Sequence, residues 1–241
     1  MGPLGIILAS VLAGAVAAVS GFGIGSLLTP MLVLSLGMPT AGAVAVLAVP
    51  HALATAIRFV RLRADVHMPT FREFGVASAV GGLAGAALQS QLTSPVLTIV
   101  LSALLVLAGT TELLQRRVPL PQTSGWRLAG GILSGLFGGL VGNQGGIRSA
   151  ALMGFDLSKE TFVATATAVA LVVDGARMPV YIWKEGRSLR PLWPEIAAAT
   201  AGVLLGTIVG VRVLRRIPER VFRPSVSILI TALGVYMLLH R

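Results

Sequence analysis

The sequence contains two apolar segments interrupted by glycine-rich stretches, and each is followed by three further apolar segments. Glycines recur in the same order 121 to 125 positions later: Gly21 with Gly142, Gly81 with Gly202, Gly85 with Gly206, and Gly109 with Gly234. A helix broken at membrane depth frees backbone groups that lipid cannot satisfy, so a break is tolerated only where the backbone faces protein, water or a ligand. The sequence therefore predicts two repeats of four segments each, residues 1–115 and 125–241.

The composition is that of an integral membrane protein. Of the 241 residues, 55% are hydrophobic and 12% are charged, and the mean hydropathy is +0.87. Apolar stretches of about 20 residues, enough to cross a hydrocarbon core, recur along the chain. They exclude a water-soluble globular domain and leave no room for a separate catalytic domain. We therefore expect one transmembrane domain over residues 1–241, no enzyme activity and no cofactor.

The net charge of +10 would suggest a nucleic-acid partner in a soluble protein. Here 17 of the 19 basic residues fall in predicted loops or at segment ends, which is a topology signal in membrane proteins. We expect the lipid bilayer as a partner and no nucleic acid. With no cysteine and only three dispersed histidines, the chain offers no disulfide and no predicted metal site.

Eight apolar segments are predicted, all helical, because open strands cannot span lipid. The first repeat holds a broken segment at 4–36 and further segments at 41–60, 74–88 and 96–114. The second holds a broken segment at 126–153 and further segments at 161–183, 196–211 and 224–239. A polar linker at 115–125 joins the two repeats.

The length of the first broken segment favours a re-entrant hairpin. As one straight helix, its 33 residues would measure about 50 Å, against a bilayer core of about 30 Å. If both broken segments enter and leave on one side, the two repeats are inverted relative to each other. The loop and end cations then divide 13 to 4 in favour of the cytoplasm, with Arg58 among the 13; full crossings give 11 to 6. Positive residues prefer the cytoplasmic side, so the inverted arrangement is favoured.

Inverted repeats with broken helices place a binding site near the midplane and direct half-helix N-termini at anionic groups. We therefore expect a small anionic substrate bound by residues of the two breaks. The candidate binding residues are Ser20, Gly21, Phe22, Gly23, Gly25 and Ser26 in the first break, and Asn143, Gln144, Gly145, Gly146 and Arg148 in the second. The alternative is that these glycines only allow close helix packing.

Arg148 is the sharpest single candidate, because it is a charged residue in an apolar or small-residue setting. Its guanidinium could hold an oxyanion through two hydrogen bonds. The alternative is that the side chain reaches the cytoplasmic interface near Asp156 and Lys159.

Three residues are candidates for coupling or gating. Asp174 and Arg177 lie three positions apart in one segment, hence on one helical face, and can form a pair that only fixes packing. If Asp174 titrates instead, it is the best carboxylate for proton coupling. His51 occupies the equivalent segment of the first repeat and could carry a proton or serve as a packing residue.

The stretches SGFGIGSLLTPMLVL and AVAVLAVPHALATA in the first half, and GGILSGLFGGLVGNQGG and ATATAVAL in the second, resemble the sulfite exporter TauE/SafE family. The likeness covers nearly the whole chain. It implies movement of sulfite, sulfonates or carboxylates. Members carry a Phe-Gly-Ile-Gly turn in both halves; here the first half keeps it as Phe22-Gly23-Ile24-Gly25, but the second reads Gly142-Asn143-Gln144-Gly145-Gly146.

The expected function is a secondary transporter that moves a small anion such as sulfite, an organosulfonate or a carboxylate by alternating access. Protons are a candidate coupling ion, and the cytoplasmic (inner) membrane is the expected location of this multi-pass chain. A passive anion channel and a membrane subunit of a larger complex are the alternatives. The sequence does not set the oligomeric state.

Overall fold

The computed structural model describes residues 3–20, 23–114, 123–153, 155–210, 212 and 216–240. Its regular elements within these ranges are all helical. In the first half they are α1 (Pro3–Ser20), α2 (Gly25–Leu36), α3 (Thr40–Leu62), η1 (Arg63–Asp65), α4 (Met68–Thr70), η2 (Phe71–Gly75), α5 (Val76–Gln89) and α6 (Ser94–Leu113). In the second half they are α7 (Ser124–Val141), α8 (Gly145–Leu152), α9 (Lys159–Leu189), η3 (Arg190–Leu192), α10 (Trp193–Leu205), η4 (Gly206–Gly210) and α12 (Glu219–Leu239).

Both predicted helix breaks are present. The first lies between the end of α1 at Ser20 and the start of α2 at Gly25. The second is narrower than predicted, because α8 already begins at Gly145 and its first turn contains Arg148. Gly142 ends α7 with a φ of 71°, in the left-handed region that a side chain with a Cβ rarely adopts. The local conformation therefore explains the choice of glycine at this break.

The chain is an all-helical membrane protein. Four described stretches are long and apolar enough to cross a membrane: Thr40–Asp65, Ser94–Leu113, Lys159–Ile208 and Arg220–Leu239. Large apolar side chains are exposed on the outside, for example Val76, Val80 and Leu83 of α5. Such a surface suits lipid and would be a liability in water. The opposite orientation of the two repeats in the membrane stays a prediction.

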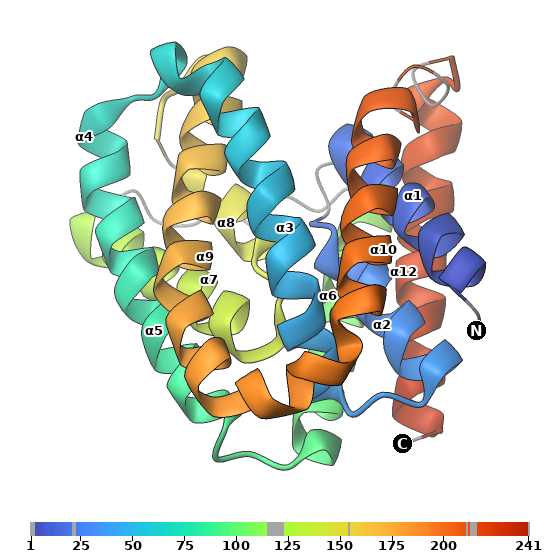
Figure 1. Cartoon of the computed structure of the whole chain (residues 1–241). Helices are drawn as coiled ribbons and strands as arrows, with labels where there is room; N and C mark the ends of the chain where they lie inside the picture. The colour runs from blue at the N-terminus through green and yellow to red at the C-terminus, as the bar shows by residue number, and fades with distance from the viewer. Residues whose placement is uncertain are drawn as a thin grey trace.

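Two helix bundles form the body of the protein (Figure 1). We define the first bundle as α1, α2, α3 and α10, since α10 packs against both α1 and α3. The second bundle consists of α7, α8, α9 and α5, since α5 packs against both α7 and α9. Helices α6 and α12 pair with each other, and α3 meets α9 between the bundles. Each half of the chain thus supplies one helix to the bundle of the other half.

Glycines bring the exchanged helices into backbone contact. A Cβ added at any of four positions would overlap a carbonyl group on the partner helix: Gly81 that of Ile132, Gly85 that of Leu136, Gly202 that of Ile7, and Gly206 that of Val11. The first pair joins α5 to α7 and the second joins the end of α10 and η4 to α1. Lipid is as apolar as leucine, so close packing of small residues replaces the hydrophobic effect in holding membrane helices together.

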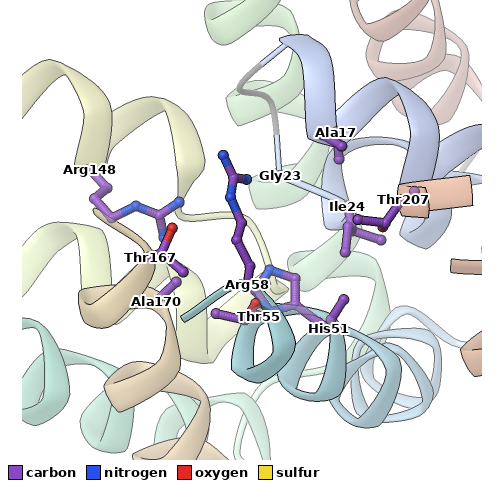
Figure 2. Close-up of a pocket in the computed structure, with 13 residues that line it drawn as sticks. Ala17, Gly23, Ile24, His51, Thr55, Arg58, Arg148, Thr167, Ala170 and Thr207 are labelled. Carbon is purple, nitrogen blue, oxygen red and sulfur yellow. Dashed lines mark hydrogen bonds between the residues drawn. The ribbon is translucent and has the colours of Figure 1, made fainter. Parts of the chain in front are cut away.

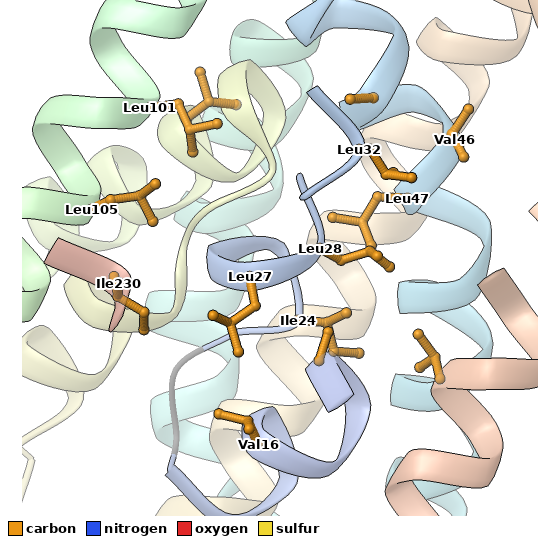
Figure 3. Close-up of a cluster of buried hydrophobic side chains, with 14 of the residues drawn as sticks. Val16, Ile24, Leu27, Leu28, Leu32, Val46, Leu47, Leu101, Leu105 and Ile230 are labelled. Atoms are coloured by element: carbon orange, nitrogen blue, oxygen red, sulfur yellow. The ribbon is translucent and has the colours of Figure 1, made fainter. Parts of the chain in front are cut away.

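A cluster of buried apolar side chains holds the half-helix α2 inside the protein (Figure 3). Leu27 and Leu28 of α2 are 1% and 0% exposed. The surrounding side chains come from four neighbouring helices: Val16 of α1, Leu47 of α3, Leu101 and Leu105 of α6, and Ile230 of α12. The cluster fixes the first break within the protein, away from lipid.

The glycine contacts predict a sharp difference between two identical substitutions. Gly85→Ala forces the α5 and α7 backbones apart, and overpacking of this kind costs about 1–3 kcal/mol. Gly42→Ala in α3 meets open space and serves as the matched control. Thermal unfolding of the purified protein in detergent is expected to show a lower Tm for Gly85→Ala and an unchanged or higher Tm for Gly42→Ala. Equal Tm values would contradict the packing argument.

Candidate anion site

The two helix breaks lie directly against each other. A Cβ on Gly25 would overlap the carbonyl oxygen of Gly142, so the start of α2 touches the end of α7 through backbone. Beside this contact, the Ser26 hydroxyl lies 3.4 Å from Oδ1 of Asn143, 117 residues away, and both side chains are buried. The structure therefore brings Gly25, Ser26 and Asn143 together; that they bind an anion stays a prediction.

The last carbonyl groups of α7 have side-chain partners from neighbouring helices. Arg177 donates from Nη1 to the Gly138 carbonyl, and the Tyr181 hydroxyl donates to the Gly139 carbonyl. Gln89 of α5 donates from Nε2 to the Leu140 carbonyl at 3.2 Å. The Gly139 and Leu140 carbonyls thereby gain the partners that a helix end lacks. The Gly138 carbonyl also accepts from the Gly142 amide at 3.1 Å. The positive Arg177 also complements the negative end of the α7 dipole.

His51, Asp174 and Arg177 form a buried triad that joins the two bundles. Nδ1 of His51 lies 2.7 Å from Oδ2 of Asp174, and Nη2 of Arg177 lies 2.8 Å from Oδ1. Their side chains are 9%, 1% and 1% exposed. The predicted Asp174–Arg177 pair is confirmed, and His51 adds a contact across 123 positions. Because Asp174 forms an ion pair with Arg177 and a hydrogen bond with His51, its charge is compensated inside the protein.

A cavity of about 90 Å³ lies between the two bundles. Its walls from the first bundle include Gly14 and Ala17 of α1, Gly23 and Ile24 of the first break, His51, Thr55 and Arg58 of α3, and Thr207 of η4. The second bundle contributes Arg148 of α8 and Thr167 and Ala170 of α9. Figure 2 shows Arg148 on one side of this space and Gly23 and Thr207 on the other, with Arg58 between them. The cavity thus touches the first helix break and the first turn of α8, which follows the second helix break.

Arg148 and Arg58 supply the positive charge of the cavity. Nε and Nη1 of Arg148 are buried and have no hydrogen-bond partner among the described residues. Arg148 lines the cavity. This position differs from the predicted alternative, in which the side chain reaches the interface near Asp156 and Lys159. Arg58, counted among the cytoplasmic loop and end cations, lies near the end of α3 and also lines the cavity. Its cytoplasmic placement stays a prediction.

Three of the predicted site residues line the cavity, namely Gly23, His51 and Arg148. Asn143, Gln144 and Gly145 are buried near the breaks but do not line it, and Gly146 is exposed. The amide groups of Asn143 and Gln144 retain atoms without hydrogen-bond partners, Nδ2 of the first and Nε2 and Oε1 of the second. The predicted Gly21 and Phe22, and the Ser20 side chain, lie outside the described residues.

Four further residues line the cavity and were not predicted from the sequence: Thr55, Arg58, Thr167 and Thr207. A signal was available for two of them, since Thr55 and Arg58 follow His51 by four and seven positions and share its helical face. Thr167 precedes Asp174 by the same seven positions on α9. Among the described residues, no group of three or more His, Asp or Glu side chains could hold a metal ion.

This fold and cavity define a class: a helical, multi-pass membrane protein with a cationic cavity between two bundles. The sequence matches the model of the family described as sulfite exporter TauE/SafE over residues 6–237. The chain belongs to this family of membrane transporters of sulfur-containing anions. Comparisons with curated proteins and with solved structures gave no match.

The buried triad predicts a non-additive pair of substitutions. Asp174→Asn leaves the Arg177 charge buried without its counter-ion, which costs about 3–5 kcal/mol. Combining it with Arg177→Gln removes the uncompensated charge and is expected to recover more than half of the lost stability. A double-mutant cycle of thermal or denaturant unfolding in detergent measures this coupling. Additive losses would show that the two side chains do not act as a pair.

Proposed function

We propose that this protein is a secondary transporter that moves a small anion, such as sulfite, an organosulfonate or a carboxylate, by alternating access across the cytoplasmic membrane. The proposal rests on one observation: a cavity that carries two arginines, touches a broken helix and takes its walls from both bundles. Membership of a family of sulfur-anion transporters supports the same class of cargo.

The chemistry of the cavity suits an oxyanion. Guanidinium groups bind oxyanions through charge-assisted hydrogen bonds, and Arg148 has two buried N–H positions without a protein partner. Thr55, Thr167 and Thr207 add hydroxyl groups to the walls. At about 30 Å³ per molecule of liquid water, the cavity has room for roughly three waters. That volume suits an anion of a few heavy atoms.

The depth of the cavity supports alternating access over a channel. Arg58 is exposed, whereas His51, seven residues or about 10 Å earlier along α3, is buried. Beyond His51, the fully buried Val44 and Leu47 of α3 pack on Gly142 and Gly25. Packed side chains therefore occupy the space past the floor of the cavity. A relative movement of the two bundles would be needed to open a path on that side.

Transport by the purified full-length protein in liposomes tests the proposal. Sulfite inside the liposomes is expected to accelerate uptake of labelled sulfite, because a transporter exchanges its substrate across the membrane. A channel would show uptake without this acceleration. No uptake of sulfite, sulfonates or carboxylates by the protein alone would contradict the proposal and favour a subunit of a larger complex.

A substitution of Arg148 tests whether this side chain binds the transported anion. Arg148→Gln is expected to lower initial sulfite uptake by about 10- to 100-fold, because a charge-assisted hydrogen bond contributes about 1.5–3 kcal/mol and each 1.36 kcal/mol is tenfold. Arg187→Gln, at an exposed position near the end of α9, removes the same charge away from the cavity and is expected to leave uptake unchanged. Equal rates in the two variants would place the anion elsewhere.

A further inference from the structure

The charges around the cavity do not balance. Asp174 is the acid of the triad, and Arg177 already compensates its charge at 2.8 Å. Arg58 and Arg148 line the cavity with no acidic residue among the other lining side chains. The two guanidinium groups repel each other, while Asp174 attracts that of Arg148. With His51 neutral, the triad and the cavity together therefore carry three arginines against one carboxylate, an excess of two positive charges.

The His51 ring presents one nitrogen to Asp174 and leaves the other for the cavity. Nδ1 lies 2.7 Å from Oδ2 of Asp174, so a neutral ring keeps its proton on Nδ1 and donates it to the carboxylate. No hydrogen bond is found for Nε2 among the described residues, and this atom is not one of the fully buried unpartnered atoms. In the neutral ring, Nε2 carries a lone pair that would repel an oxyanion. Protonation turns the same atom into a donor.

Deepening the proposed function, on which this inference rests, we infer that the cavity binds a doubly charged oxyanion together with one proton. The oxyanion lies between Arg58 and Arg148, and the proton resides on Nε2 of His51. Asp174 is a positioning residue, because its two oxygens hold His51 on one side and Arg177 on the other. Anion binding and protonation of His51 then strengthen each other by the same factor.

The charged and titratable groups that face His51 come from three helices. They are Arg58 on its own helix α3, Arg148 on α8, and Asp174, Arg177 and Tyr181 on α9. Helices α1 and α2 carry no titratable side chain. Glu195 of α10 lies twelve residues, about three turns, before the lining residue Thr207. On the remaining neighbours, Glu112 of α6 pairs with Arg223, and Arg127 of α7 stacks on Phe155. His51 is thus the imidazole among these groups, and an imidazole can gain a proton on its second nitrogen.

The linkage is tested by calorimetric binding of sulfate to the full-length protein in detergent between about pH 5.5 and 8.5. Sulfate keeps both charges over this range, so any proton taken up belongs to the protein. The dissociation constant is expected to rise with pH, by about tenfold per pH unit at the steepest, since one proton is linked. His51→Gln retains a polar side chain and is expected to abolish this slope. The exposed His240→Gln is the matched control and is expected to keep it.

The charge preference is tested with a second probe, methanesulfonate, which carries a similar head group with one charge. The wild type is expected to bind sulfate at least tenfold more tightly than methanesulfonate. Arg58→Gln is expected to remove most of this preference by weakening sulfate binding. Arg61→Gln, exposed in the last turn of the same helix, is the control that retains it.

The outcomes separate this inference from the proposed function. If liposomes containing the protein transport sulfite but the protein binds sulfate no more tightly than methanesulfonate, the dianion site is wrong and the transporter proposal stands. A pH slope that persists in His51→Gln places the linked proton elsewhere and also overturns the inference. Folding of each variant is checked by its elution volume and Tm, and His51→Asn serves as a second variant if His51→Gln fails to fold. No transport of any anion would overturn both.

Discussion

Lipid offers no hydrogen-bond partner to a backbone amide or carbonyl group, and this constraint governs how the two broken helices are built into the protein. The two breaks pack against each other, with Gly25 against the Gly142 carbonyl, and side chains of α5 and α9 donate to the last carbonyls of α7. Arg177 donates to the Gly138 carbonyl and also compensates the charge of Asp174. The triad thus links the end of α7 to the contact between α3 and α9.

The same constraint explains why polar groups are concentrated in one region. A cavity at membrane depth needs walls that can be hydrated, and irregular backbone is tolerated only against such a cavity or inside protein. Gly23 lies at the first helix break, and Arg148 lies in the first turn of α8, just after the second break. From opposite bundles, they supply polar groups to the cavity wall. The buried apolar cluster around α2 keeps lipid away from the same region.

Much of the fold could be predicted from the sequence, because membrane helices are long and apolar and their breaks are marked by glycine. Both breaks and the Asp174–Arg177 pair were predicted in this way, while the extent of the second break was overestimated, since Gly145 and Gly146 are compatible with a helix start as well as with a turn. Arg58 was assigned by its nearness to a segment end. Its role as a lining residue depends on which face of α3 meets the second bundle, and that information lies in tertiary contacts rather than in local sequence.

The exchange of α5 and α10 between the bundles has a consequence for biogenesis. Helix α1 leaves the ribosome early, but α10, whose glycine Gly202 packs against it, begins at Trp193, in the last quarter of the chain. The first bundle therefore stays incomplete during most of translation, with small residues and a helix break facing the insertion machinery or lipid. Since α5 in turn completes the bundle of the second half, neither half of the polypeptide can finish folding alone, and maturation is a late event that engages both at once.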